Sequence, residues 1–70
     1  MKTEANIAFG RNIAKLRLER GMTQDDLAFC CGFDRTYIGT IERGEKSATI
    51  NTIDKLAKGL GLKMKDLFDY

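Results

Sequence analysis

The sequence predicts a small all-α domain of five short helices, and three observations support this fold class. Apolar residues recur at the 3.6-residue spacing of amphipathic helices. Glycines end several of these stretches, and threonine or aspartate follows them at N-cap positions. No segment alternates apolar and polar residues with the period of two that marks a β-strand. We therefore expect helices joined by tight turns and no sheet.

The first predicted helix covers residues 4–20. Phe9, Ile13 and Leu16 mark its apolar face, because residues three or four apart lie on one side of a helix. Gly21 follows, and it can adopt the left-handed conformation that commonly ends a helix.

Two shorter helices are predicted next, at residues 24–31 and 35–43. Thr23 is a good N-cap for the first of them, and Asp26 three residues later completes an approximate capping box. Gly32 can adopt the left-handed conformation that lets the chain reverse within the three residues between the helices. Such a pair, with so short a connection, predicts a helix-turn-helix.

The predicted helix-turn-helix covers residues 24–43. Ala28 is expected where its two helices cross, since a larger side chain would force them apart. Asp34 is expected to cap the second helix of the pair. The apolar residues between the pair and the rest of the domain are Leu27, Cys31, Ile38 and Ile41. This packing leaves the outer face of the second helix free to enter a DNA major groove.

A fourth helix is predicted at residues 50–60, after the N-cap residue Thr49, and a short last turn or helix near residues 64–69. The apolar stripe of the fourth helix comprises Ile50, Ile53, Leu56, Ala57 and Leu60. One domain over residues 1–70 is expected, because a chain of this length can enclose only one small core.

Composition narrows the classes of partner and cofactor. Cys30 and Cys31 are adjacent, so they cannot join distant segments, and the chain has no histidine to complete a metal site. No metal, cofactor or small-molecule ligand is therefore expected. No apolar run reaches the roughly 20 residues of a membrane span, and the first ten residues lack the apolar core of a signal peptide. We expect a cytoplasmic protein without membrane contact.

A further set of residues carries a resemblance to a known family. The set comprises Ile13, Leu16-Arg17, Gly21-Met22-Thr23-Gln24, Leu27-Ala28, Gly32, Tyr37-Ile38, Ile41-Glu42-Arg43-Gly44 and Ile53 to Leu60. In this combination the chain resembles the Xre family, the phage-repressor and Cro type of helix-turn-helix domain, with its five-helix lambda-repressor-like fold. The strings RLERGMTQDDLA and DRTYIGTIERG are most similar to controller proteins of restriction-modification systems, small dimers that bind palindromic operators.

The resemblance also implies roles for individual residues. Residues expected over DNA base edges are Arg35, Thr36 and Thr40, and among them Arg35 alone has the planar fork that takes guanine O6 and N7 together. Residues expected at DNA phosphates are Thr23, Gln24, Tyr37, Arg43, Lys46 and Ser47. Arg17 and Glu42 resemble the ion pair that ties the first helix to the end of the third.

Two residues near this surface are unusual. Gly39 lies inside a predicted helix, where glycine costs about 1 kcal/mol relative to alanine, and its missing side chain would permit close approach to DNA. Glu45 departs from the expected pattern, since an acidic side chain near a phosphate is unfavourable.

The C-terminal residues predict a symmetric homodimer. The apolar residues that exceed what one short last helix needs to bury are Leu62, Met64, Leu67, Phe68 and Tyr70. A two-fold dimer would place the two recognition helices about 34 Å apart, one DNA turn. The alternative is that these side chains only cover the core of the monomer.

The leading functional hypothesis is a sequence-specific, dimeric DNA-binding regulator of transcription. An antitoxin-type interaction module that also binds its operator is the alternative, although such proteins usually carry an extra segment for the toxin. An enzyme is not expected, because the chain has no histidine, no glycine-rich phosphate loop and no nucleophile with a base at a recognisable spacing.

Overall fold

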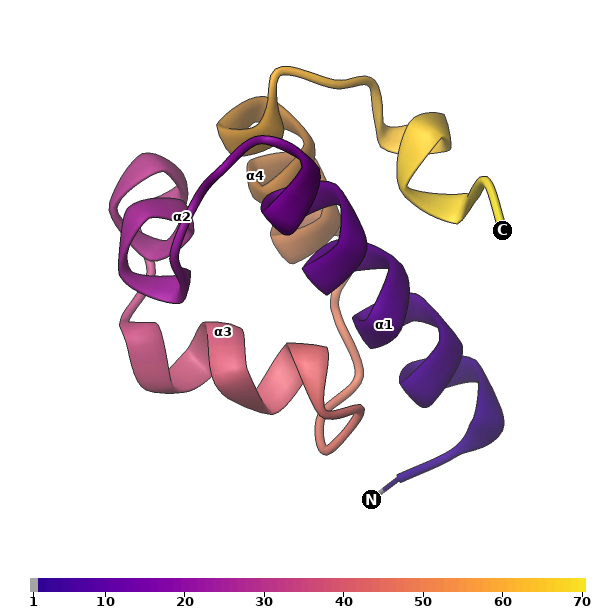
Figure 1. Cartoon of the computed structure of the whole chain (residues 1–70). Helices are drawn as coiled ribbons and strands as arrows, with labels where there is room; N and C mark the ends of the chain where they lie inside the picture. Colours follow the sequence, from indigo (N-terminus) through magenta and orange to yellow (C-terminus); the bar gives the residue numbers. More distant parts are fainter. Residues whose placement is uncertain (1) are drawn as a thin grey trace.

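The computed structural model describes residues 2–70 and contains four α-helices followed by one 3₁₀ helix (Figure 1). In chain order they are α1 (Glu4–Glu19), α2 (Gln24–Cys31), α3 (Arg35–Glu42), α4 (Ile50–Leu60) and the 3₁₀ helix η1 (Met64–Phe68). No residue from 2 to 70 lies in a strand, so the all-α prediction is confirmed. The prediction of five helices is corrected to four, because the segment expected to form a short last turn or helix is a 3₁₀ helix of five residues, a tighter form that is common in short segments.

Threonine side chains start three of the α-helices. The hydroxyl of Thr3 accepts from the amide of Asn6, and that of Thr49 accepts from the amide of Thr52. Thr23 and Asp26 form the complete capping box before α2, with each side chain accepting from the other residue's amide. These bonds satisfy amides that have no partner inside a helix, and they explain why the helix starts were predictable from the sequence.

The start of α3 differs from the prediction. Asp34 occupies the N-cap position with an extended backbone, but its side chain makes no capping hydrogen bond. The Asp34 carbonyl accepts from the amides of Tyr37 and Ile38 at 3.0 and 3.2 Å. Backbone hydrogen bonds alone therefore start α3, and the Asp34 carboxylate stays exposed.

The turn between α2 and α3 is built as predicted. Gly32 ends α2 in the left-handed conformation, with φ of 76°. The amide of Phe33, the next residue, donates to the Ala28 carbonyl at 2.9 Å and closes the end of the helix. The chain thereby changes direction at once, so that α3 lies below α2 in Figure 1.

A single core joins the helices. α2 packs against both α3 and α4, and α1 packs against α3. The largest fully buried side chains are Ile13, Leu27, Ile38, Ile41, Leu56 and Leu67. Because these residues come from all five helices, the core fixes α3 relative to the rest of the domain and leaves its opposite face at the surface.

Gly10 allows α1 to cross the end of α3 at very short range. A Cβ atom at this position would collide with the carbonyl oxygens of Ile41 and Glu42. Gly10 lies inside a helix, where glycine is usually unfavourable, and its role was not predicted from the sequence. The close approach brings the side chains of α1 to the C-terminal end of α3.

η1 docks on α1 through one buried hydrogen bond and one buried side chain. Asn12 donates through Nδ2 to the Leu67 carbonyl at 2.8 Å, and the Leu67 side chain is fully buried. The expectation that Leu67 lies at a dimer interface is therefore wrong, because it belongs to the core of the monomer. No helix among the described residues is long and apolar enough to span a bilayer.

Candidate nucleic-acid interface

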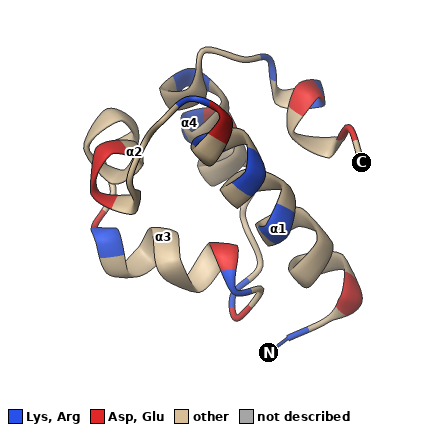
Figure 2. Ribbon diagram, in the orientation of Figure 1, with Lys and Arg blue, Asp and Glu red and all other residues tan. Residues whose placement is uncertain are grey.

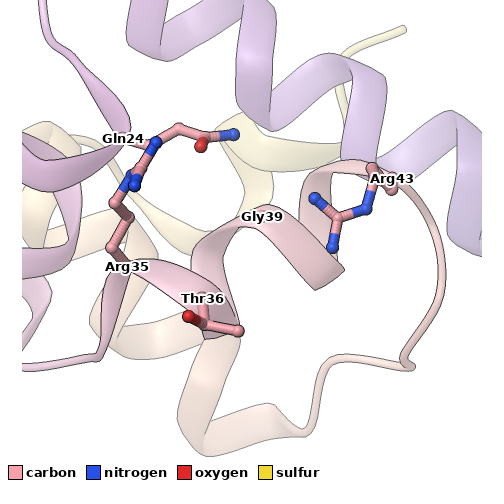
Figure 3. Close-up of a pocket in the computed structure, with 5 residues that line it drawn as sticks. All are labelled: Gln24, Arg35, Thr36, Gly39 and Arg43. Atoms are coloured by element: carbon pink, nitrogen blue, oxygen red, sulfur yellow. The ribbon is translucent and has the colours of Figure 1, made fainter.

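The exposed face of α3 borders an open hollow of about 220 Å³. Its lining residues are Gln24, Arg35, Thr36, Gly39 and Arg43. Figure 3 shows Gln24 and Arg35 near the start of α3 and Arg43 at its end, with the guanidinium of Arg43 turned back toward Gly39. Two predicted base contacts, Arg35 and Thr36, therefore share one surface with two predicted phosphate contacts, Gln24 and Arg43.

Basic residues lie at both ends of α3, as Figure 2 shows. Arg35 at the first position of α3 is exposed, and its Nε lies 3.7 Å from Asp25 Oδ1 on α2. This ion pair is long and both side chains face water, so it contributes little to stability. Arg35 can therefore leave Asp25 for another partner at small cost.

A largely buried ion pair holds the end of α3. Arg17 on α1 donates to both carboxylate oxygens of Glu42, from Nε at 2.7 Å and from Nη2 at 3.1 Å. The side chains are only 11% and 6% exposed. Arg17 also donates to the Met22 carbonyl at 2.8 Å, and Gln24 donates to Glu42 Oε1 at 3.0 Å. The structure thus brings together the two residues expected to pair and adds Gln24 to them.

Gln24 is partly buried and hydrogen-bonded, unlike an ordinary exposed glutamine. Its Nε2 is held by Glu42 while the residue also lines the hollow beside Arg35. Gln24 is the first residue of α2, where free backbone amides and the helix dipole favour an anion. The side chain is therefore fixed next to the start of α2, whose first turn also carries the carboxylates of Asp25 and Asp26.

The hydroxyls of Thr40 and Tyr37 already have partners within the protein. Thr40 donates to the Tyr37 carbonyl at 2.7 Å, and Thr40 does not line the hollow that contains Arg35 and Thr36. The Tyr37 hydroxyl lies 3.0 Å from Thr52 Oγ1, while its ring packs edge-on against Phe33. Any contact of these two residues with DNA would have to share or replace those bonds.

The remaining predicted phosphate contacts lie at the surface. Thr23, Lys46 and Ser47 are all exposed. The Ser47 hydroxyl accepts from Asn6 Nδ2 at 3.0 Å, which ties the loop after α3 to the start of α1.

Hydrogen bonds from the Thr23 amide and hydroxyl hold the pKa of Asp26 below its ordinary value, so this carboxylate is charged beside the start of α2.

The partner of Arg43 is Glu45, a contact that was not predicted from the sequence. Arg43 donates from Nε and Nη2 to the two carboxylate oxygens of Glu45 at 2.8 and 3.2 Å. The Arg43 hydrogen bond lowers the pKa of Glu45, and the nearby Lys2 charge acts in the same direction. Opposite charges two residues apart were visible in the sequence, but Gly44 between them has φ of 76°, and this turn is what makes the side chains meet.

The C-terminal residues expected at a dimer interface divide into two groups. Leu62 and Met64 are partly buried against the core, like the fully buried Leu67. Phe68 stacks on Phe9 with ring centroids 5.3 Å apart and is still 49% exposed, while Tyr70 is 63% exposed. Phe68 and Tyr70 are therefore the two of the five that offer substantial apolar surface to a partner.

The sequence and structure of this chain are similar to those of known helix-turn-helix proteins. A helix-turn-helix family profile matches residues 13–67. Control protein C.BamHI of Bacillus amyloliquefaciens is 39% identical over 71 residues, which cover 100% of this chain and 88% of that protein. The crystal structure of the restriction-modification controller protein C.AhdI from Aeromonas hydrophila has a TM-score of 0.92 and 36% identity, covering 94% of this chain and 100% of that one.

A further solved structure contains DNA. The restriction-modification controller protein C.Esp1396I has been crystallised as a tetramer in complex with its natural 35-base-pair operator. Its TM-score to this chain is 0.89 at 38% identity, over 97% of this chain and 90% of that one.

Proposed function

The chain belongs to the helix-turn-helix family, and we propose that it is a transcriptional regulator of the Xre type that binds palindromic operator DNA as a homodimer. Its similarity to C.BamHI, C.AhdI and C.Esp1396I supports a controller protein of a restriction-modification system. These relatives are named as control and controller proteins, which supports binding rather than catalysis. The proposed place of action is the cytoplasm.

The observation that carries this proposal is the surface of α3. Buried residues and the Arg17–Glu42 pair fix the inner side of the helix, while Arg35 and Thr36 stand on the exposed side. α3 is an α-helix, and with its side chains an α-helix is about 10–12 Å across, close to the width of about 12 Å of the major groove. The exposed side therefore has the size and the donors to read base edges.

We propose that Arg35 is the main base-reading residue, with Thr36 and Thr40 beside it. Arg35 stands at the N-terminal end of α3, the end that helix-turn-helix proteins direct to base edges. Its ion pair with Asp25 is weak enough to exchange for guanine O6 and N7. Lys46 and Ser47, together with Thr23, Gln24 and Tyr37, are proposed to contact phosphates on either side.

The test begins with selection of preferred sites from a library of random duplexes. Binding of wild-type protein to the selected duplex and to a scrambled duplex is then compared with that of Arg35→Ala at one salt concentration. We expect Arg35→Ala to lose about 1–3 kcal/mol on the selected duplex and little on the scrambled one. Equal losses on both duplexes would make Arg35 a phosphate contact.

Lys46→Ala is the matched control for a residue that contacts phosphate. Lys46 is exposed in the loop after α3, so its replacement leaves the core intact. We expect similar losses on both duplexes and a salt dependence reduced by about one phosphate contact. If the wild-type protein enriches no sequence from the library, the proposed function itself is wrong.

A further inference from the structure

The Arg43–Glu45 pair leaves the end of the Arg43 guanidinium available. A guanidinium has five N–H donors in a plane. Glu45 uses the edge formed by Nε and Nη2, at 2.8 and 3.2 Å. One donor on Nη1 and the second donor on Nη2 form the end of the guanidinium, and this end can still bind guanine O6 and N7 together.

Gly39 provides the space in which this guanidinium lies. A Cβ atom at Gly39 would be 2.9 Å from Arg43 Nη1, closer than side-chain atoms normally approach. The guanidinium therefore lies back over α3 rather than extending beyond its end, as Figure 3 shows. This position places Arg43 in the same hollow as Arg35 and Thr36.

Charge argues against a phosphate as the partner of this guanidinium. Glu45 keeps its negative charge, since the Arg43 bond lowers its pKa. A phosphate bound at the free end would meet a guanidinium that a carboxylate already neutralises, with that carboxylate close by. A base edge carries no formal charge and needs directed donors, which a carboxylate-held guanidinium supplies in a fixed plane.

We propose that Glu45 is a positioning residue that holds Arg43 over the exposed face of α3, so that Arg43 reads a guanine in the same half-site as the base pair read by Arg35. The inference rests on the proposed function, operator binding through α3. It replaces the phosphate role that the family resemblance implies for Arg43. It also gives Gly39 and Glu45, the two unusual residues of this surface, one shared purpose.

The test compares base preferences rather than affinity alone. Preferred sites are selected from random duplexes with wild-type protein, Arg43→Ala and Glu45→Gln. Glutamine offers one acceptor oxygen where glutamate offers two, so it cannot hold both Nε and Nη2. We expect Arg43→Ala and Glu45→Gln to lose a guanine preference of about ten-fold or more at the same base pair of each half-site. The preference assigned to Arg35 should remain.

Binding to a scrambled duplex provides the second readout. Glu45→Gln removes a negative charge near DNA, so its affinity for scrambled duplex should equal or exceed that of the wild type. Reduced base preference together with unreduced non-specific affinity is an outcome that general damage to the fold does not produce. Glu19→Gln makes the same charge change at an exposed residue at the end of α1 and should leave the base preference unchanged.

Gly39→Ala tests the same geometry from the other side. Alanine strengthens a helix relative to glycine, so the variant folds, but its methyl group must displace the Arg43 guanidinium. We expect it to lose the same guanine preference as Glu45→Gln. An unchanged preference in Arg43→Ala, with a smaller salt dependence, would overturn the proposal and make Arg43 a phosphate contact. A wild-type protein without any preferred site would instead reject the proposed function.

Discussion

Arg17 and Glu42 are charged side chains that the fold removes almost completely from water. Arg17→Met would leave the Glu42 carboxylate in this shielded site with the Gln24 amide but without its cationic partner. We expect the variant to lower the free energy of unfolding by about 3–5 kcal/mol. Urea denaturation followed by circular dichroism measures this loss.

Lys58→Met is the matched control for that substitution. Lys58 pairs with Asp54 one turn away at 3.1 Å, and the lysine is exposed. Its removal should change the free energy of unfolding by less than about 1 kcal/mol. Similar losses from the two variants would show that burial does not strengthen the Arg17–Glu42 pair.

Asp26 makes the stability of α2 depend on pH. Its pKa is lowered in the folded protein by hydrogen bonds from Thr23, so the stabilisation is present above the unfolded pKa and is lost as the pH falls through the folded value. We expect the urea midpoint to fall on acidification below about pH 4. Asp26→Asn should show a smaller fall over the same range. An identical fall in both proteins would assign the acid sensitivity to other carboxylates.

The close crossing of α1 and α3 predicts how a substitution at Gly10 affects the packing of these two helices. Gly10→Ala places a methyl group against the carbonyl oxygens of Ile41 and Glu42, and backbone atoms cannot move aside without separating the helices. We expect a loss of about 1–3 kcal/mol in the free energy of unfolding, despite the better helix propensity of alanine. Thermal and urea unfolding both measure it.

Gly39→Ala is the natural comparison, because it is the same substitution in another helix. At Gly39 the new methyl group meets the guanidinium of Arg43, the mobile end of a long side chain. We expect unchanged or increased stability, by up to about 1 kcal/mol. A loss as large as that of Gly10→Ala would mean that the Arg43 side chain cannot move from its place.

The helices were predictable because their limits depend on local chemistry. Thr23 and Thr49 start α2 and α4 where the sequence analysis placed them, and Gly32 and Gly61 end the same helices. The cap of α3 was predicted wrongly, since the presence of Asp34 does not determine where its side chain points. The length of η1 also left open whether it would form an α-helix or a 3₁₀ helix.

Contacts between helices could be predicted only where the resemblance to a known family included them. The Arg17–Glu42 pair was expected from the resemblance and is present at 2.7 Å. The bond from Asn12 to the Leu67 carbonyl joins residues 55 positions apart, and neither residue type indicates the other. The collision at Gly10 depends on how closely two helices approach, a distance that spacing along the chain does not contain.

At the scale of the whole molecule, the C-terminal surface predicts assembly. Phe68 and Tyr70 expose aromatic surface two residues apart in the chain, whereas Phe29, 88% exposed, lies apart on α2. We expect sedimentation equilibrium at micromolar concentration to show a species of about 16 kDa, twice the 7.9 kDa of one chain. Tyr70→Ser should weaken that association and Phe29→Ser should not. A species of one chain only would contradict a stable dimer without DNA.

The Glu42 carboxylate has a consequence for how such proteins acquire new targets. Arg17 from α1 and Gln24 from α2 both donate to it, so one side chain at the end of α3 joins three helices. Arg35 and Thr36 take no part in this junction, and neither does Arg43. Substitutions at these three positions can therefore accumulate without disturbing the junction. A duplicated copy of this domain could diverge toward a different operator while its scaffold remained unchanged, and an engineer could retarget it in the same way.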